Sequence, residues 1–481
     1  MLNLMNIFLE ILKFINLLIS LLLLVNLSSV LIKQYYSLSR FYKVLINHTN
    51  YYLLFALIEL IIIFIPWEIL RYLLSILIGV FWLIKINKLA FKLSRRSILL
   101  ITTSSLMVIS FYFYPFVLIN HLLSVLFVLS VSSLLLLPLE EIIKKHYIKK
   151  AREKINKFAP LIIGITGSFG KTSFKNHLIT ALSSKYVIGS PNGNINTLMG
   201  ICKYINNQYS GEEILVLELG IDHKYQMERF KTLIKLDFAI ITSVGNMHLA
   251  TFKCVENVLI EKMKIKSLLK ENGYLFINED NEYLNKVDGP NIIKYSQRNV
   301  KILDFNIEGI KVEFKDQIYN FNVHQSFFTS YLDGIIKVCH MLNIEEENIY
   351  YLSNYFIDFK RRNEIYKTDK GYLIDNSYNA NLKGIEDSIN LLNTLEGDKL
   401  IITGGIKEQG KSLFKENEKL KDLLSNQQVI FVGENNHPFV KKHHFSKLLF
   451  AKNINDAYKL IKELSPNHIL LLCKGDNIYL R

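Results

Sequence analysis

The segment that most constrains the fold is residues 164–173, which read GITGSFGKTS. An apolar run at 161–165 precedes it, and a helix-compatible run at 174–182 follows. A strand, a glycine loop and a helix in this order can cradle a phosphate, because backbone N–H groups turn inward and the helix N-terminus adds its positive dipole end. We expect Lys171 to reach the terminal phosphates and the Thr172 hydroxyl to bind Mg²⁺. The first glycine of the common GxxxxGK[ST] spacing is missing, so an ordinary Gly-Ser turn is the alternative.

The first third of the chain is far more apolar than the rest. Its apolar runs lie at about 7–32, 51–66, 69–86, 97–118 and 120–139. A membrane span needs roughly 20 apolar residues, so the second and third runs are short and could form a hairpin. We predict a helical transmembrane region over residues 1–143 with about five spans, with the first run a retained anchor rather than a signal peptide. The alternative is that some of the short runs are buried or interfacial helices.

Basic residues flank these apolar runs. Of the net charge of +14, residues 1–150 carry +9 and the remainder only +5. Three basic clusters stand out, namely Lys33, Arg40 and Lys43; Lys85, Lys88, Lys92, Arg95 and Arg96; and Lys144, Lys145, Lys149, Lys150 and Arg152. Five spans place all three on the cytoplasmic side. We therefore predict a multi-pass protein of the inner (cytoplasmic) membrane, with its soluble part facing the cytoplasm, the lipid bilayer as a partner and no nucleic-acid-binding face.

Beyond residue 158, short β-type runs alternate with helical stretches, as in a parallel sheet covered by helices. After the phosphate loop comes GNINT at 193–197; then a strand ends in Glu218, another leads to His248, and Lys262 follows on a predicted helix. Taken singly, Glu218 could be solvated, His248 could cap a helix and Lys262 could be a surface lysine. At the carboxyl ends of parallel strands, such groups converge on a phosphate crevice. There Glu218 could bind Mg²⁺ and His248 a second ion.

The order TGSxGKT, GNxN, ELG, GNxHL and a helical lysine resembles the ATP-dependent Mur ligase family, and most closely its MurF type. The resemblance continues to the end of the chain. KRRNE at 360–364 is similar to the family's GRxE, DNSYNAN at 375–381 to DDSYNANP, ITGGIKEQG at 402–410 to LGDMxELG, and KGD at 474–476 to KGS. It covers about residues 158–481.

The resemblance implies an α/β fold in two parts behind the membrane region. A basic linker at 144–157 would lead to a central P-loop parallel-sheet ATPase domain at 158–359. A smaller Rossmann-like domain would occupy 360–481. The expected strands of this second domain are 372–375, 400–403, 429–432 and 469–472. Residues from both domains would meet at the nucleotide, which implies closure before chemistry.

The activity implied by the resemblance is ADP-forming amide ligation with ATP and Mg²⁺. D-alanyl-D-alanine would be joined to UDP-N-acetylmuramoyl-tripeptide through an acyl phosphate, in the peptidoglycan synthesis that supports cell shape and division. Implied catalytic residues are Lys171, His248, Lys262 and Arg362. Implied nucleotide contacts are Thr166, Gly167, Ser168, Gly170, Lys171, Thr172, Ser173, Asn278, Arg362, Asp375, Tyr378 and Asn379. Implied metal ligands are Thr172, Glu218, His248 and Lys262, with Lys262 at the place of the family's carbamylated lysine.

The sequence departs from the family in two places that leave alternatives open. Ser330 stands where an asparagine helps to hold the adenine. Membrane runs stand where MurF ligases have a soluble domain that grips the UDP-sugar. The acceptor could therefore be a lipid-linked precursor, another envelope polymer or a poly-amino-acid. A non-catalytic nucleotide-sensing membrane module is the second alternative.

Overall fold

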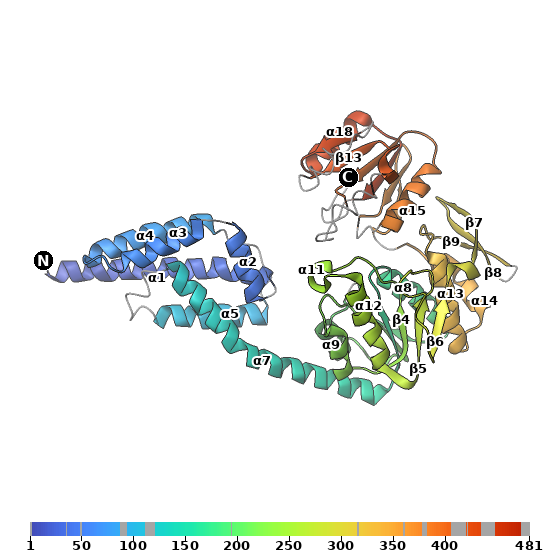
Figure 1. The fold of residues 1–481 in the computed structure, drawn as a ribbon, viewed down its shortest axis with the longest axis horizontal. Helices are drawn as coiled ribbons and strands as arrows, with labels where there is room; N and C mark the ends of the chain where they lie inside the picture. The colour runs from blue at the N-terminus through green and yellow to red at the C-terminus, as the bar shows by residue number, and fades with distance from the viewer. Residues whose placement is uncertain are drawn as a thin grey trace. The chain divides into compact units, whose positions relative to one another are not determined.

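The computed structural model describes residues 2–34, 36–48, 51–86, 94–110, 121–193, 195–314, 317–358, 361–377, 382–405, 420, 422–433 and 448–472. They fall into two compact units, Met1–Lys145 and His146–Arg481. Figure 1 shows the first as helices only and the second as two α/β parts. Each unit is described by itself below. The first is called the N-terminal unit, and the second is called the catalytic unit because it contains the residues predicted to bind the nucleotide.

The N-terminal unit is helical throughout its described part. Its helices are α1 (Leu2–Lys33), α2 (Leu38–His48), α3 (Tyr51–Ile62), α4 (Glu68–Lys85), α5 (Arg95–Ser110) and α7 (His121–Phe158). Each predicted apolar run lies largely within one of these helices. Among the described residues, two helical segments are both long and apolar enough to cross a membrane, Asn3–Lys33 and His121–Phe158. Five spans therefore remain a prediction.

The segment expected to be a basic linker is helical. Residues 144–157 form the C-terminal part of α7, which is continuous from the apolar run. Lysine, glutamate and alanine favour a helix, which accounts for its continuation beyond the apolar residues. Ala151 and Ile155 pack into the core of the catalytic unit, so the end of α7 belongs to that unit.

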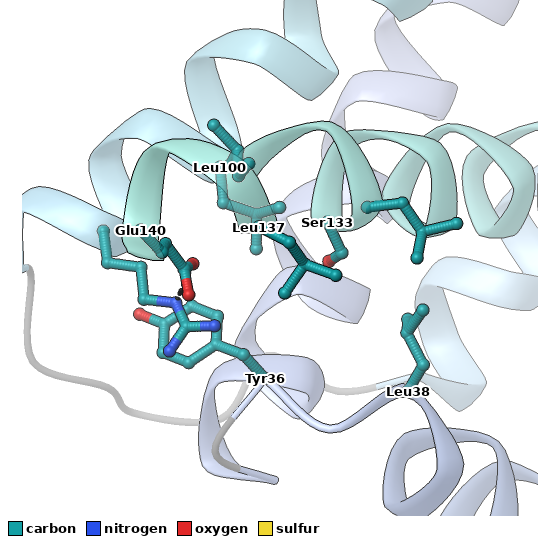
Figure 2. A pocket seen from close by; sticks show the side chains of 9 residues that line it. Tyr36, Leu38, Leu100, Ser133, Leu137 and Glu140 are labelled. Carbon is teal, nitrogen blue, oxygen red and sulfur yellow. Dashed lines mark ion pairs between the residues drawn. The ribbon is translucent and has the colours of Figure 1, made fainter. Parts of the chain in front are cut away.

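The N-terminal unit contains a small cavity of about 180 Å³ beside α5 and α7. Figure 2 shows apolar side chains on its wall, including Leu38, Leu100 and Leu137. At its polar end the Arg96 guanidinium lies 3.8 Å over the Tyr36 ring, and its Nε lies 2.5 Å from Glu140 Oε1. The ion pair and the ring together fix the arginine at the cavity edge.

The central part of the catalytic unit is built on a parallel sheet, as predicted. Its strands are β1 (Leu161–Thr166), β2 (Ile188–Gly189), β3 (Ile214–Glu218), β4 (Leu236–Ile241), β5 (Leu269–Asn278) and β6 (Ile292–Tyr295), in the order β2-β3-β1-β4-β5-β6. In the register of β1 and β3, Ile165 lies beside Glu218. The phosphate loop and Glu218 therefore leave the sheet at the same edge.

Helices cover both faces of this sheet (Figure 1). They are α8 (Lys171–Leu182), α9 (Leu198–Asn207), α10 (Gln226–Arg229), α11 (Leu249–Phe252), α12 (Val255–Met263), α13 (Phe328–Met341) and α14 (Glu346–Tyr351). Alternate residues of each strand point to opposite faces. Accordingly, Ile163 packs with α8 and α13, whereas Ile162 packs with α9 and α12.

An antiparallel sheet of β7 (Lys301–Asn306), β8 (Gly309–Phe314) and β9 (Gln317–Phe321) follows, which the sequence did not predict. The C-terminal part has β10 (Glu364–Lys367), β11 (Tyr372–Asp375), β12 (Lys399–Thr403), β13 (Val429–Val432), β14 (Leu448–Ala451) and β15 (His468–Leu472), with α15 (Leu382–Asn393) and α18 (Ile454–Leu464). The strand order is β10-β11-β15-β12-β13-β14, and only β10 is antiparallel to its neighbour. The four strands expected here are confirmed.

A buried histidine makes the core of the central part sensitive to acid. The His177 side chain of α8 is 2% exposed and stacks on Phe356, with ring centroids 5.6 Å apart. Burial lowers the pKa of His177 from its ordinary 6.5 to about 3. As the pH falls below 6.5, the unfolded chain takes up a proton that the folded chain does not, so the folded state loses stability.

We therefore expect His177→Phe to reduce the acid sensitivity of folding. Between about pH 7 and about pH 5, the wild type should lose roughly 2 kcal/mol more stability than the variant. Hydrogen exchange of α8 peptides along a urea series measures this difference. The control is His146→Phe, because His146 is an exposed histidine on α7. Equal pH dependence of the wild type and His177→Phe would contradict the expectation.

Candidate active site

The phosphate loop at 166–170 is shaped by the chain segments that follow β3 and β4. The Thr166 hydroxyl donates to Leu219 O at 2.9 Å. The Ser168 N–H donates to Ser243 O at 2.8 Å, and the Phe169 N–H to Ser243 Oγ at 2.8 Å. The neighbouring strand ends therefore fix the loop conformation.

Two glycines of this loop have no room for a side chain. A Cβ on Gly167 would lie 2.0 Å from Thr242 Oγ1, and one on Gly170 would lie 1.6 Å from the Tyr331 hydroxyl. Gly170 also has a φ of 77° and is the N-cap of α8. Only glycine permits a backbone this close to its neighbours, so these two positions fix the tight turn of the loop before α8.

We expect Gly170→Ala to be far more damaging than Gly193→Ala. Gly193 has a φ of 64°, but a Cβ there would have nothing within 4 Å. Alanine at Gly193 therefore causes the same kind of backbone strain as alanine at Gly170, without the steric overlap. The left-handed conformation costs about 1–2 kcal/mol in both variants, and overlap with Tyr331 adds about 1–3 kcal/mol in the first. Urea unfolding and ATP titration measure both effects. Equal stability and equal ATP affinity of the two variants would contradict this account.

Thr172 and Glu218 form the metal-binding candidate. The Thr172 hydroxyl lies 2.9 Å from Glu218 Oε2, and Asn196 Nδ2 donates to Glu218 Oε1 at 3.2 Å. Glu218 is 2% exposed. The structure therefore brings together a hydroxyl and a carboxylate, the oxygen ligands that Mg²⁺ prefers, at the start of α8. In the described part of the chain, no group of three or more His, Cys, Asp and Glu side chains has metal-binding geometry.

Three cationic side chains share this region. Lys171 Nζ donates to Gly167 O at 2.7 Å, and burial lowers the Lys171 pKa, opposed by Glu218. Lys262 of α12 is 3% exposed, and its pKa lies well below the usual value because of burial and the charge of Lys171. Arg362 Nη1 lies 3.4 Å from Ser173 Oγ on α8. The structure brings Lys171 within electrostatic range of both Arg362 and Lys262, and their roles at one site stay a prediction.

The other predicted site residues are more dispersed. Asn278, at the end of β5, accepts a hydrogen bond from the Ser330 hydroxyl at 3.1 Å, so two positions expected near the nucleotide are in contact.

His248 has a φ of 56°, precedes α11 and interacts electrostatically with Asp222. Asp375 ends β11 and accepts from the Ser377 N–H at 3.0 Å. Tyr378 and Asn379 lie outside the described residues, as do Asn194 and the KGD segment at 474–476.

Sequence reasoning missed a second buried lysine on α8. Lys175, one turn after Lys171, is 2% exposed. Its Nζ donates to Pro191 O at 3.0 Å and to Gly193 O at 2.9 Å. It therefore ties α8 to the segment that carries Asn196. Nothing in the sequence around Lys175 distinguishes it from a surface lysine, because its partners come from another loop.

The central part of the catalytic unit matches a known protein family. Residues 165–351 match the Mur ligase middle domain. A curated UDP-N-acetylmuramoyl-tripeptide–D-alanyl-D-alanine ligase of Borreliella burgdorferi is 31% identical over 296 residues, covering 56% of this chain and 62% of that protein. The chain thus spans less than two thirds of this relative's length.

Solved structures show the same fold. MurF from Acinetobacter baumannii superposes with a TM-score of 0.62 at 18% identity, over 69% of this chain and 77% of that one. MurF ligase from Thermotoga maritima in complex with ADP gives 0.60 at 24% identity, over 69% and 80%. Residues 165–351 therefore match the Mur ligase middle domain, and the relatives that the chain resembles carry names of the MurF type.

Proposed function

We propose that the chain is an ATP-dependent, ADP-forming amide ligase that joins D-alanyl-D-alanine to UDP-N-acetylmuramoyl-tripeptide in peptidoglycan precursor synthesis. The observation that carries this is the meeting of Lys171, the Thr172–Glu218 pair and Arg362 around the start of α8. These groups come from the phosphate loop, a strand end and the C-terminal part. The relatives of the chain carry the name of this activity.

The site fits a nucleotide with Mg²⁺. The loop glycines let the backbone pack tightly against Thr242 and Tyr331, and the Lys171 ammonium lies over the loop carbonyls. Thr172 and Glu218 would hold Mg²⁺, which would supply positive charge against the phosphates. Asn278 and Ser330 lie together where the resemblance expects a nucleotide contact. Asp375, Tyr378 and Asn379 are proposed contacts from the C-terminal part.

In the proposed reaction, a carboxylate oxygen of the tripeptide attacks the γ-phosphorus of ATP, and the bond to the ADP oxygen breaks. The D-alanyl-D-alanine amine then attacks the acyl carbon, loses a proton, and phosphate leaves with the electrons of the C–O bond. Lys171 and Arg362 would stabilise the charge of the transferring phosphoryl group. Closure of the C-terminal part over the loop would exclude water from the acyl phosphate.

Lys262 and His248 are proposed to serve a second metal position. Burial lowers the pKa of Lys262, which favours the neutral amine. A neutral amine is the form that adds CO₂, and the resulting carbamate would present an anionic oxygen. Mass spectrometry of the intact protein under CO₂ tests this assignment directly, with Lys262→Arg as the control that cannot be modified there.

Positional isotope transfer tests the reaction. Tripeptide substrate labelled with ¹⁸O in its terminal carboxylate should deliver one ¹⁸O to each phosphate released, because that oxygen bridges the acyl phosphate. Unlabelled phosphate accompanying amide formation would contradict the acyl-phosphate route. If the protein hydrolyses ATP but forms no amide product, this acceptor is wrong and a different acceptor is expected.

The helical N-terminal unit favours a second acceptor class. It stands where the family's UDP-sugar domain is expected, and α1 and α7 contain the two described segments apolar enough to cross a membrane. A lipid-linked precursor could present the same peptide carboxylate to the same ligation site. Replacing the UDP-tripeptide with a lipid-linked tripeptide in the isotope experiment distinguishes the two acceptors.

We further propose that the N-terminal unit lies in the cytoplasmic membrane with the catalytic unit on the cytoplasmic side. Cys254 of the catalytic unit is exposed and offers a probe. A membrane-impermeant maleimide should modify it in inside-out vesicles but not in intact cells, with Cys254→Ser as the control. Modification in intact cells would contradict the orientation, and recovery of the chain in the soluble fraction would contradict the membrane assignment.

A further inference from the structure

A buried hydrogen-bond network joins the central and C-terminal parts of the catalytic unit. His324 and Asp358 are its core, with side chains 5% and 6% exposed. His324 Nδ1 lies 2.6 Å from Asp358 Oδ2, and Nε2 lies 2.9 Å from Ile307 O. Both ring nitrogens lie within hydrogen-bonding distance of an oxygen, so the ring is tied on both sides. The pair is thereby held in one geometry.

Gln325 extends this network to Arg362. It is 6% exposed, and its Nε2 donates to Asp358 Oδ1 at 3.0 Å and to the backbone O of Arg362 at 2.9 Å. The two protons of one amide group thus reach both acceptors. The Arg362 backbone is anchored to the central part, while its guanidinium reaches Ser173 on α8.

The backbone around Arg362 is bent in an unusual way. Arg361 and Asn363, on either side of it, have φ values of 62° and 60°. Non-glycine residues seldom adopt this conformation and keep it only where neighbours enforce it. Here Asn363 Nδ2 donates to His324 O at 2.5 Å, and the Ser388 hydroxyl donates to Asn363 Oδ1 at 2.6 Å. The network therefore enforces the turn that directs Arg362 toward the phosphate loop.

We propose that Gln325, fixed by Asp358 and His324, is the positioning residue that directs Arg362 to the terminal phosphate of bound ATP. The inference rests on the proposed function only in taking ATP as the nucleotide and Arg362 as its γ-phosphate contact. ADP lacks that phosphate. Loss of the Gln325 contact should therefore weaken ATP binding and leave ADP binding nearly unchanged. A general loss of folding would instead weaken the binding of both nucleotides.

A double-mutant cycle on nucleotide binding tests this role in the detergent-purified full chain. The measured quantity is the preference for ATP over ADP, the ratio of their dissociation constants, in the wild type, Gln325→Met, Arg362→Ala and the double variant. Methionine keeps the length of the side chain and removes both donors. Each single variant should lower the preference about tenfold, as expected for the loss of one charge-linked hydrogen bond. The double variant should lose no more than either single variant.

Ser326→Ala is the matched control. Ser326 lies next to Gln325, and its hydroxyl lies 2.7 Å from Asp387 Oδ1 on α15, so it links the same two parts of the chain without touching Arg362. It should leave the ATP preference within about twofold of wild type. Gln325→Asn, which keeps the amide but is too short to span both acceptors, replaces Gln325→Met if that variant does not fold.

Additive losses in the double variant, or an unchanged preference in Gln325→Met, would overturn the positioning role. An unchanged preference in Arg362→Ala would overturn the γ-phosphate contact on which it depends. The assay needs no acceptor substrate, so failure of the ligase reaction would refute the proposed function without touching this inference.

Discussion

Lys171→Ala is expected to lower ATP-dependent turnover by about 10³-fold, the largest effect of any single substitution considered. The Lys171 ammonium lies against the loop carbonyls and close enough to Glu218 and Arg362 for electrostatic interaction. Charge that develops on the transferred phosphoryl group would lose its nearest cation. Water that took the place of the ammonium would have to reorient as the charge develops. The loss of rate should therefore appear mainly in kcat.

The fold should tolerate this change. Burial lowers the pKa of Lys171, so keeping its charge in the folded chain is expected to cost free energy, and alanine should leave stability nearly unchanged. The proposed membrane insertion of the N-terminal unit should also be unchanged. Lys203→Ala is the control, since Lys203 is an exposed lysine on α9. Full turnover by Lys171→Ala would show that the phosphate loop is assigned to the wrong segment.

Glu218→Gln should have the second largest effect, a loss of about 10²-fold in kcat/KM at limiting Mg²⁺. Glutamine keeps the shape of the side chain and its contacts with Thr172 and Asn196, but it removes the negative charge. A neutral amide is a weaker ligand for Mg²⁺ than a carboxylate. The signature is therefore a shift of the Mg²⁺ dependence to higher concentration, with partial recovery at saturating metal.

Magnesium titrations of the wild type, Glu218→Gln and Glu271→Gln measure this shift. Glu271 is an exposed glutamate on β5 and should behave as wild type. A Glu218 variant with unaltered metal dependence would remove Glu218 from the metal site. Its buried carboxylate would then serve only to hold Thr172 and Asn196.

Much of the catalytic unit could be predicted from local sequence. Strands β11 and β13 have the predicted bounds, because short runs of apolar residues between polar turns leave few alternatives. Glu218 and Lys171 were placed at one edge because the carboxyl ends of parallel strands meet there. The glycines of the sequence predicted a tight loop at this edge. Gly167 and Gly170 occupy positions where a Cβ would overlap another chain segment.

The features that were missed depend on contacts between distant segments. Lys175 is buried because the loop at 190–193 closes over it, and its own neighbours in sequence give no sign of this. Gln325 contacts both Asp358 and the Arg362 backbone only when the C-terminal part folds against the central part.

The most direct test of the central claim is product formation by the detergent-purified full chain. The mixture contains ATP, Mg²⁺, UDP-N-acetylmuramoyl-tripeptide and D-alanyl-D-alanine, and both phosphate release and product mass are followed. We predict phosphate release that requires every component. We also predict a product that is heavier than the tripeptide substrate by two alanyl residues. Protein that binds ATP yet releases no phosphate and forms no such product would contradict the assignment of these acceptor and donor substrates.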